Sequence, residues 1–374
     1  MSKYTYIDVF AGCGGLSLGM EQAGFTPVFM NDIDPICSKT YKFNFNLTDK
    51  QIFIGDIARL NEEWKTTYAK YIGDVDLVCG GPPCQGFSTA NRQRLIDDPR
   101  NKLYKEYVLF LSQIRPKFFV MENVKGMQRK IDEIIQDFHQ YLGTNYTFSY
   151  KILNAKNFGV PQNRERLIFI GNRMGGNTDK IFENIESAKY PHFVLKDALE
   201  GLPVLFPNKK KNDTSIENDK IGFKECAYQY SQTQFFKFIN SHEVTKLYNH
   251  KNRYNNERDI EIFRRLPQGA NSLHESIVDI MPYKKRLGIF KDKYFKLNEN
   301  EVCKTITSHM KFDCNMYIHP TQPRGLSPRE AARVQTFPDD FVFLGPQNSW
   351  YHQIGNAVPV KLAYAIGKEI KKWI

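Results

Sequence analysis

Short apolar runs alternate with longer amphipathic stretches up to about residue 175 of the chain. The apolar runs end in small or polar residues, as buried strands do. They cover residues 4–10, 28–31, 51–54, 75–79, 117–121, 146–153 and 166–171. Helical periodicity appears between them, at 16–24 and 101–114. This alternation predicts an α/β protein with a doubly wound, mostly parallel sheet, whose ligands bind in the loops after the strands.

A basic, aromatic region follows a Gly/Asn-rich break at 174–178. Between residues 208 and 311 the chain has 20 Lys and Arg against 13 Asp and Glu, which is +7 of a total formal charge of +11. The span also holds 13 Phe and Tyr residues, and we predict a second, smaller domain there. Charge alone leaves two interpretations open, a surface for a polyanion or a solvated face over an aromatic core. Amphipathic helices are expected after it, at 328–335 and 360–371.

Composition excludes several classes of protein. The chain has 374 residues, and 41% hydrophobic with 25% charged residues is ordinary for a folded globular protein. No apolar run approaches the roughly 18 residues that span a bilayer, and the first residues lack a signal peptide pattern. We therefore expect a cytoplasmic protein without a membrane partner. Seven cysteines without a CxxC pair argue against a disulfide framework, and eight histidines without ligand spacing argue against a metal site.

The loop after the first strand, residues 8–15, reads DVFAGCGG and opens a predicted helix. Its glycines let the backbone turn sharply and bring helix amides close to a ligand. Asp32 follows the second predicted strand about 20 residues further on, where related folds place a carboxylate on ribose hydroxyls. Asp56 follows the third. The glycines alone fit a tight structural turn equally well, but together with the two carboxylates they favour a nucleoside site.

The loop after the fourth strand, GGPPCQGFS at 80–88, presents Cys84 between prolines and glycines. Prolines stiffen the backbone before the thiol, and glycines leave it accessible. A thiol in such a loop becomes nucleophilic once its pKa is lowered. The alternative is a buried cysteine that acts as a small apolar residue, which is the role expected of Cys79 inside the strand. The surrounding prolines and glycines favour a nucleophile at Cys84.

Two further loops add charged groups at the same predicted sheet edge. Glu122 ends a strand and could protonate or hydrogen-bond a ring nitrogen of a bound base. In QNRER at 162–166, Arg164 and Arg166 alternate before a strand, so both would face one side and could hold an anionic or carbonyl oxygen. Each charge could equally belong to the surface. Together the four loops bring a nucleophile, an acid and two cations to a nucleoside site.

The motifs, in this order, resemble those of the cytosine-5 DNA methyltransferases of the bacterial or phage restriction-modification type. The cofactor, catalytic-cysteine and following catalytic blocks of that family are similar to FAGCGG at 10–15, PPCQGFS at 82–88, ENV at 122–124 and QNRER at 162–166. The block that supports the recognition domain, and the last block, which returns to the cofactor pocket, resemble RGLSPREAARVQTFPDDF at 324–341 and GNAVP at 355–359. The resemblance extends over nearly the whole chain.

The resemblance implies a Rossmann-like methyltransferase fold and transfer of a methyl group from S-adenosylmethionine to carbon 5 of cytosine. Cys84 would be the thiolate that adds to carbon 6 and makes carbon 5 nucleophilic. Glu122 would interact with ring nitrogen 3. Arg166, with Arg164 close by, would orient the base and the catalytic loop. The base that removes the carbon 5 proton is not identified by the sequence.

By the same resemblance, Asp32 would take the ribose hydroxyls of the cofactor and Asp56 the adenine amino group. The family often has Glu and a bulky aromatic residue where this chain has Asp32 and Ile33. The complete expected set of cofactor residues is Phe10, Ala11, Gly12, Gly14, Gly15, Asp32, Ile33, Asp56, Pro83, Leu103, Asn356 and Val358.

The resemblance also divides the chain by function. It implies a catalytic and cofactor-binding domain at 1–178, a target-recognition domain at 179–322, and a C-terminal segment at 323–374 that completes the catalytic domain. Double-stranded DNA would be the substrate, with the target cytosine flipped out of the helix and lysines and arginines on the phosphates. The segments 264–271 and 304–309 resemble recognition elements. A monomer is expected, with a cognate restriction endonuclease that acts on the same site as partner.

Three alternatives compete with this interpretation. An RNA cytosine-5 methyltransferase shares the scaffold, but the tRNA-modifying branch carries a Cys-Phe-Thr signature that is absent here, and the more distant branch replaces ENV by a second cysteine. A non-catalytic DNA-binding relative would not need Cys84 together with Glu122 and Arg166. A nicotinamide dehydrogenase would leave the PPCQ and ENV loops unexplained.

Overall fold

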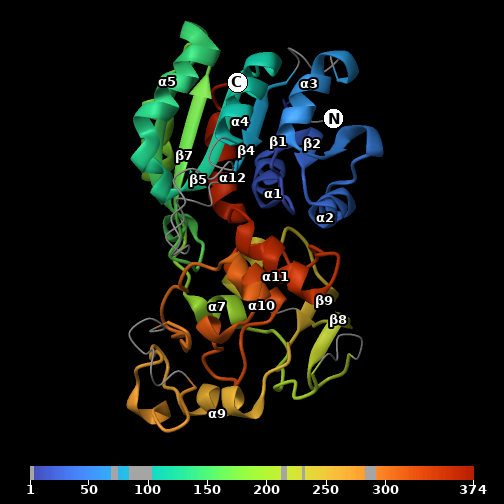
Figure 1. Cartoon of the computed structure of the whole chain (residues 1–374), viewed down its shortest axis with the longest axis vertical. Coiled ribbons are helices and arrows are strands. Elements are labelled where there is room, and N and C mark those ends of the chain that lie inside the picture. The colour runs from blue at the N-terminus through green and yellow to red at the C-terminus, as the bar shows by residue number, and fades with distance from the viewer. Residues whose placement is uncertain (1–3, 69–74, 84–102, 212–216, 230–231, 283–291) are drawn as a thin grey trace. The chain divides into compact units, whose positions relative to one another are not determined.

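The computed structural model describes residues 4–68, 75–83, 103–211, 217–229, 232–282 and 292–374 (Figure 1). The chain divides into two compact units. The first comprises Met1–Gly159, Arg164–Pro191 and Ala357–Ile374, and the second comprises Val160–Asn163 and His192–Asn356. The backbone therefore passes from one unit to the other four times.

The first unit is built on a seven-stranded sheet in the order β3-β2-β1-β4-β5-β7-β6. Its strands are β1 (Tyr4–Val9), β2 (Phe25–Asp32), β3 (Ile52–Ile54), β4 (Leu77–Gly80), β5 (Phe118–Val124), β6 (Thr147–Asn154) and β7 (Glu165–Asn172). Strands β1 to β5 run parallel, and β7 is antiparallel to β5 and β6. The predicted mostly parallel sheet is confirmed. Its strand order reverses between β1 and β4, where ligands of such folds bind.

Helices cover both faces of this sheet (Figure 1). In one layer lie α3 (Ile57–Thr67), α4 (Leu103–Ile114) and α5 (Ile131–Leu142), and in the other α1 (Gly15–Ala23), α12 (Val360–Ile370) and α6 (Thr178–Ser187). The helix α2 (Pro35–Phe45) follows β2. Alternate strand residues are buried on both faces: Val9 and Val78 pack with α3 to α5, while Tyr6 and Leu77, of opposite parity, are buried as well. Burial on both faces is the reason that the strands read as nearly continuous apolar runs.

The second unit contains less regular structure. Its described elements are α7 (Leu195–Leu199), β8 (Gly222–Ala227), α8 (Gln234–Ile239), β9 (Lys246–Lys251), α9 (Glu257–Arg265), α10 (Pro328–Val334), α11 (Gln347–Asn356) and the short 3₁₀ helices η8 (Glu275–Ile277), η10 (Ser308–Lys311) and η11 (Asn315–Tyr317). Strands β8 and β9 pair antiparallel. Two small hydrophobic clusters lie apart from each other, one around Phe263 and Tyr294 and one around Phe236 and Leu247.

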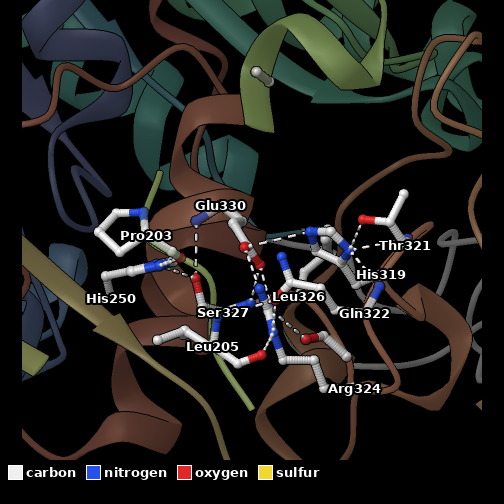
Figure 2. A network of polar contacts seen from close by, with 12 residues as sticks. Pro203, Leu205, His250, His319, Thr321, Gln322, Arg324, Leu326, Ser327 and Glu330 are labelled. Carbon is white, nitrogen blue, oxygen red and sulfur yellow. Dashed lines mark hydrogen bonds and ion pairs between the residues drawn. The ribbon is translucent and has the colours of Figure 1, made fainter. Parts of the chain in front are cut away.

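Buried polar groups supplement these small cores (Figure 2). The guanidinium of Arg324, which has no exposed surface, donates to both carboxylate oxygens of Glu330 at 2.7 and 2.6 Å. Glu330 also accepts the backbone amide of Ser327, whose hydroxyl caps α10 in return. All residues of α10 are buried, so the amphipathic helix expected at 328–335 is wrong in its exposure.

Residues 323–356 pack within the second unit, and only Ala357–Ile374 returns to the first. There α12 lies against α1 at a position that requires glycine, because a Cβ on Gly19 would lie 2.3 Å from that of Ala363. The functional boundaries at 178 and 322 stay a prediction. Among the described residues, no helix has the length and apolar character to cross a membrane, and no group of three or more His, Cys, Asp or Glu side chains is placed to hold a metal ion.

Candidate active site

An ion pair stands near the carboxyl end of β5. Glu122 lies opposite Ile168 of β7, and Arg166 lies opposite Val124, so the two charged residues are diagonal neighbours across the antiparallel pair. The Arg166 Nε atom is 2.7 Å from Glu122 Oε1, and only 13% and 12% of the two side chains are exposed. Burial lowers the pKa of Arg166, and the charge of Glu122 opposes that shift. The predicted acid and one predicted cation thus meet, with a small face open to a ligand.

The residues directly after β4, Gly81 and Pro82, lie beside this pair. A Cβ on Gly81 would lie 3.0 Å from Glu122 Oε2, so the backbone passes close to the carboxylate. The side-chain amide of Asn123 donates to the Pro82 carbonyl at 2.8 Å and holds the loop there. Cys84 lies outside the described residues. The chain that leads to it is anchored next to Glu122.

Two other predicted residues have different surroundings. Arg164 is only 1% exposed, and its guanidinium donates to the backbone carbonyl of Ala357 at 2.8 Å. It therefore ties together two segments of the first unit, whereas Arg166 pairs with Glu122. Cys79 is fully buried in β4, where burial raises its pKa well above the usual value, as expected of a structural cysteine.

The FAGCGG loop adopts a sharply turned backbone. Phe10, Gly12 and Gly14 have φ values of +58°, +56° and +93°. A bulky residue such as Phe10 in the left-handed region is uncommon and marks local strain, which clusters at functional sites. Gly14 has no space for a side chain, because a Cβ there would lie 2.3 Å from the ring of Phe45. Asp32, at the end of β2, fixes the loop by accepting the Gly12 amide at 2.7 Å.

The surroundings of Asp32 fit an adenosine moiety. Its second carboxylate oxygen accepts the Asp34 amide at 2.8 Å. Since each carboxylate oxygen can accept two hydrogen bonds, both retain capacity for ribose hydroxyls. Burial raises the pKa of Asp32, and the amides of Asp34 and Gly12 oppose that rise. Ile33, beside Asp32, and Ile54, opposite it on β3, are 69% and 48% exposed, an apolar surface suited to a flat ring.

Ile54 is not among the cofactor residues expected from the sequence, although an exposed apolar residue that ends a strand just before Asp56 was an available signal. Asp56 itself is exposed and caps α3 by accepting the Ala58 amide at 2.9 Å. The remaining predicted cofactor residues are spread along the chain. Ala11 and Gly15 are buried in the glycine loop, Pro83 is exposed after β4, Leu103 begins α4, Val358 is buried in the first unit, and Asn356 is an exposed residue at the end of the second unit.

A glycine-rich turn after β1, a carboxylate after β2 and an antiparallel β7 in a parallel sheet define the Rossmann-like class of S-adenosylmethionine-dependent methyltransferases. Within that class, the chain belongs to the C-5 cytosine-specific DNA methylases, whose family model matches residues 4–372. Family and fold imply that S-adenosylmethionine is the methyl donor.

Named relatives agree with this assignment. The type II methyltransferase M1.HphI of Haemophilus parahaemolyticus is 34% identical over 100% of this chain and 90% of its own length. M.DdeI of Desulfomicrobium norvegicum is 32% identical over 97% of this chain and 88% of its own. Among solved structures, a prophage-encoded protein of E. coli, named as a DNA modification methyltransferase, superposes with a TM-score of 0.78 at 26% identity over 99% of both chains. The Dnmt2 methyltransferase of S. pombe shares the fold, with a TM-score of 0.56 at 16% identity over 99% of both chains.

The family confirms the enzyme class that the ordered motifs predicted, a DNA cytosine-5 methyltransferase. It favours DNA over RNA as the substrate, and it does not support a nicotinamide dehydrogenase.

Proposed function

We propose that the protein methylates carbon 5 of a flipped cytosine in a specific double-stranded DNA sequence, with S-adenosylmethionine as methyl donor and a covalent bond between Cys84 and carbon 6. The observation that carries this proposal is the 2.7 Å pair of Glu122 and Arg166 beside the loop that leads to Cys84. The ion pair fixes the orientation of the Glu122 carboxyl group at the sheet edge where ligands bind. A carboxyl group oriented in this way can protonate or hydrogen-bond nitrogen 3 of a cytosine ring.

Cysteine addition solves the chemical difficulty, which is that carbon 5 of cytosine is a weak nucleophile. The Cys84 thiolate adds to carbon 6, and the electron density that moves through the ring is stabilised by Glu122 at nitrogen 3. S-adenosylmethionine supplies the methyl group that carbon 5 accepts. Loss of the carbon 5 proton to a base then lets the carbon–sulfur bond break, which returns Cys84 as the thiolate. Arg166 keeps the Glu122 carboxylate in place, and Arg164 orients the strand that carries Arg166.

The residues around the FAGCGG loop would hold the cofactor. Asp32 would bind the ribose hydroxyls with the lone pairs that its two backbone amides leave open. Asp56 would reach the adenine amino group, and Ile33 with Ile54 would cover the ring. The other members of the proposed pocket are Phe10, Ala11, Gly12, Gly14, Gly15, Pro83, Leu103, Asn356 and Val358.

Double-stranded DNA would be held chiefly by the proposed recognition domain at 179–322, which contains the basic span. Extruding the target base costs a few kcal/mol, which contacts to the base and the phosphates must offset. A cognate restriction endonuclease that cuts the same unmethylated site is the proposed biological partner. The enzyme is proposed to act as a cytoplasmic monomer on prokaryotic or phage DNA.

Bisulfite sequencing of DNA from cells that express the protein tests this proposal. We expect methylcytosine at one short sequence, and none with the Cys84→Ala variant, which should still bind DNA. Purified wild-type protein should also form a covalent adduct with duplex DNA that carries 5-fluorocytosine at that site, because fluorine cannot leave as the proton does. Full activity of Cys84→Ala would refute the nucleophile, and trapping on RNA but on no duplex DNA would refute the substrate.

A further inference from the structure

A buried glutamine stands where the chain enters the catalytic strand β7 from the second unit. Gln162 has no exposed surface and lies in Val160–Asn163, a four-residue segment of the second unit. Arg164 already belongs to the first unit, and Arg166 makes the ion pair with Glu122. Only three residues separate Gln162 from Arg166.

Both polar atoms of the Gln162 side chain are bonded within the second unit. Its Oε1 accepts the backbone amide of Ile306 at 2.8 Å, and its Nε2 donates to Oε1 of Gln335 at 2.9 Å. Gln335 donates in turn to the Ile354 carbonyl at 2.8 Å. The orientation of both amides is fixed, since the Ile306 N–H can only donate and the Ile354 carbonyl can only accept. We name Gln162, Ile306, Gln335 and Ile354 the crossing network.

The backbone around Gln162 is bonded to the same part of the second unit. The Asn163 amide donates to the Cys303 carbonyl at 2.8 Å, and the Cys303 amide donates to the Pro161 carbonyl at 2.9 Å. The Thr305 hydroxyl donates to the Asn163 carbonyl at 2.7 Å. Residues 161–163 and 303–306 are therefore joined by hydrogen bonds of both backbone and side chains. The second of these segments overlaps 304–309, which we assign to target recognition.

Arg164, the first residue after this crossing, is hydrogen-bonded within the first unit through both its backbone and its side chain. The Arg164 amide donates to the side-chain oxygen of Asn154 at 3.2 Å, and the Arg164 carbonyl accepts the Ala155 amide at 2.9 Å. Its guanidinium donates to Ala357, the first residue after the chain crosses between the units again.

Two crossings are thus tied together on both sides. In the first unit Arg164 joins them through Ala357, and in the second unit Gln162 joins them through Gln335 and Ile354. The second crossing also abuts the recognition segment. A Cβ on Gly355 would lie 2.2 Å from the amide nitrogen of Ser308. A shift of 303–308 would therefore move both segments that lead into the first unit.

We propose that Gln162 is a positioning residue that couples contacts made by the recognition segment 304–309 to the placement of Arg166 and Glu122. This inference rests on the proposed function. Because side chain and backbone are hydrogen-bonded on both sides of the crossing, a displacement of 303–306 is not absorbed locally but is passed to β7. A misplacement of about 1 Å near reacting groups can cost on the order of 100-fold in rate.

Gln162→Met tests the coupling, because it keeps the length of the buried side chain and removes both polar atoms. We expect kcat on the target duplex to fall about 10- to 100-fold. The dissociation constant for the same duplex should change by less than about threefold, because Gln162 itself does not bind DNA. Covalent trapping on 5-fluorocytosine DNA at saturating concentration should slow in parallel with kcat.

Asn240→Leu is the matched control. Asn240 is also buried in the second unit, accepts the Asp339 amide at 2.8 Å and donates to the Phe236 carbonyl at 3.1 Å, but has no bond to the crossing network. Its replacement should lower the melting temperature and leave kcat of the folded protein unchanged. Equal losses of kcat in Asn240→Leu and Gln162→Met, or a loss of DNA affinity in Gln162→Met as large as its loss of kcat, would overturn the coupling.

Gln335→Met removes the next link of the crossing network and serves as the test if Gln162→Met does not fold. The double variant should lose no more kcat than either single variant, since both act through one chain of bonds. Wild-type protein in the same assay separates the two proposals. Absence of DNA methylation by the wild type would contradict the proposed function, whereas an active wild type with fully active Gln162→Met and Gln335→Met variants contradicts only the coupling.

Discussion

The direction of the Glu122 carboxylate is set by two neighbouring strands. Arg166 of β7 holds Oε1 at 2.7 Å, and the backbone at Gly81 after β4 passes close to Oε2. In the proposed mechanism, a carboxylate that is already oriented before the base binds needs little reorganisation during the reaction, which is how preorganised sites lower a barrier.

Glu122→Gln should lower kcat by about 100-fold or more, because an amide can donate a hydrogen bond to nitrogen 3 but cannot protonate it. Binding of the duplex should persist. Glu165→Gln is the control on the same strand: Glu165 is exposed and pairs with Lys125 at 3.0 Å, so less than about a twofold change is expected. Steady-state kinetics at saturating DNA would decide, and similar kcat values for the two variants would contradict the role of Glu122.

Asp8 is a buried carboxyl with a distinct pH signature. It is 1% exposed and accepts the Ser17 hydroxyl at 2.5 Å. Burial is the main cause that raises its pKa to about 7; Asp32 adds to the rise and Ser17 opposes it. A carboxyl with a raised pKa binds its proton more tightly in the folded state. It therefore contributes stability below its unfolded pKa of about 4, and this is lost as the pH rises through its folded value.

Asp8→Asn should remove this titration. Between about pH 4 and pH 7, the free energy of unfolding of the wild type should fall by on the order of 4 kcal/mol relative to that of the variant. Urea unfolding at a series of pH values measures both curves. The idea fails if the two curves run parallel.

Which site residues could be predicted depended on local geometry. Glu122 and Arg166 lie within regular strands, and the sequence predicted that both lie at the same sheet edge; the register of β5 and β7 makes them diagonal neighbours there. Arg164 does not share the face on which Arg166 pairs with Glu122. The reason is that β7 begins only at Glu165, so the alternation of side chains does not extend to Arg164. Its partner Ala357 is far away in sequence, and no local pattern points to it.

At the scale of elements, α10 shows that charged residues in a helical pattern do not always mark a solvent-exposed face. Arg329 donates to the carbonyls of Tyr248, Pro338 and Phe341 and is fully buried. A periodicity argument counts such a residue as solvent-facing, so the sequence predicted an amphipathic helix. The sheet strands were predictable because most of their buried side chains are apolar.

Two buried histidines, His250 and His319, lie beside the start of α10 (Figure 2). His250 Nε2 faces the Pro203 carbonyl at 2.8 Å and must donate to it, so Nδ1 accepts the Ser327 hydroxyl. His319 Nδ1 accepts two backbone amides. Burial lowers the pKa of His250 to about 4 and that of His319 to about 3. Neither imidazole therefore carries a positive charge near neutral pH, and the carboxylate of Glu330 is balanced by the guanidinium of Arg324.

Glu330→Gln should destabilise the protein by about 3–5 kcal/mol, because it leaves the guanidinium of Arg324 as a buried, uncompensated charge. The control is Glu225→Gln. Glu225 forms an exposed pair with Lys246 at 2.6 Å, and its replacement should cost less than about 1 kcal/mol. Urea unfolding measures the free energy of unfolding of both variants. If Glu330→Gln lowers it no more than Glu225→Gln does, the buried pair of Arg324 and Glu330 contributes no more stability than an exposed pair.

At the scale of the whole molecule, neither unit is continuous in sequence. The first unit was predictable because strand and helix alternate locally over its long N-terminal part. The placement of 323–356 in the second unit depends on pairs distant in sequence, such as Arg333 with the Ala198 carbonyl and Arg324 with that of Leu205. Such pairs leave no periodic trace. The prediction that 323–374 completes the catalytic domain came from the family resemblance, and as a functional division it stays a prediction.

The uneven distribution of charge leads to a prediction about DNA binding. If DNA is held by the basic span of the second unit, replacing the exposed Lys209, Lys210 and Lys211 by Gln should weaken binding and reduce its salt dependence. The slope of log affinity against log salt should fall by about 0.9 for each DNA phosphate that the variant no longer neutralises. Fluorescence anisotropy with the target duplex at several salt concentrations measures this slope.

A second triple variant separates local phosphate binding from net charge. Lys39, Lys65 and Lys156 are exposed in the first unit, and replacing them by Gln removes the same three charges, from +11 to +8. General attraction by net charge predicts equal reductions of affinity in the two variants. Phosphate binding within the basic span predicts a smaller salt slope only in the Lys209, Lys210 and Lys211 variant, because screened charges far from the DNA contribute little at physiological ionic strength. Equal slopes in both variants would therefore place the DNA-binding lysines outside residues 209–211.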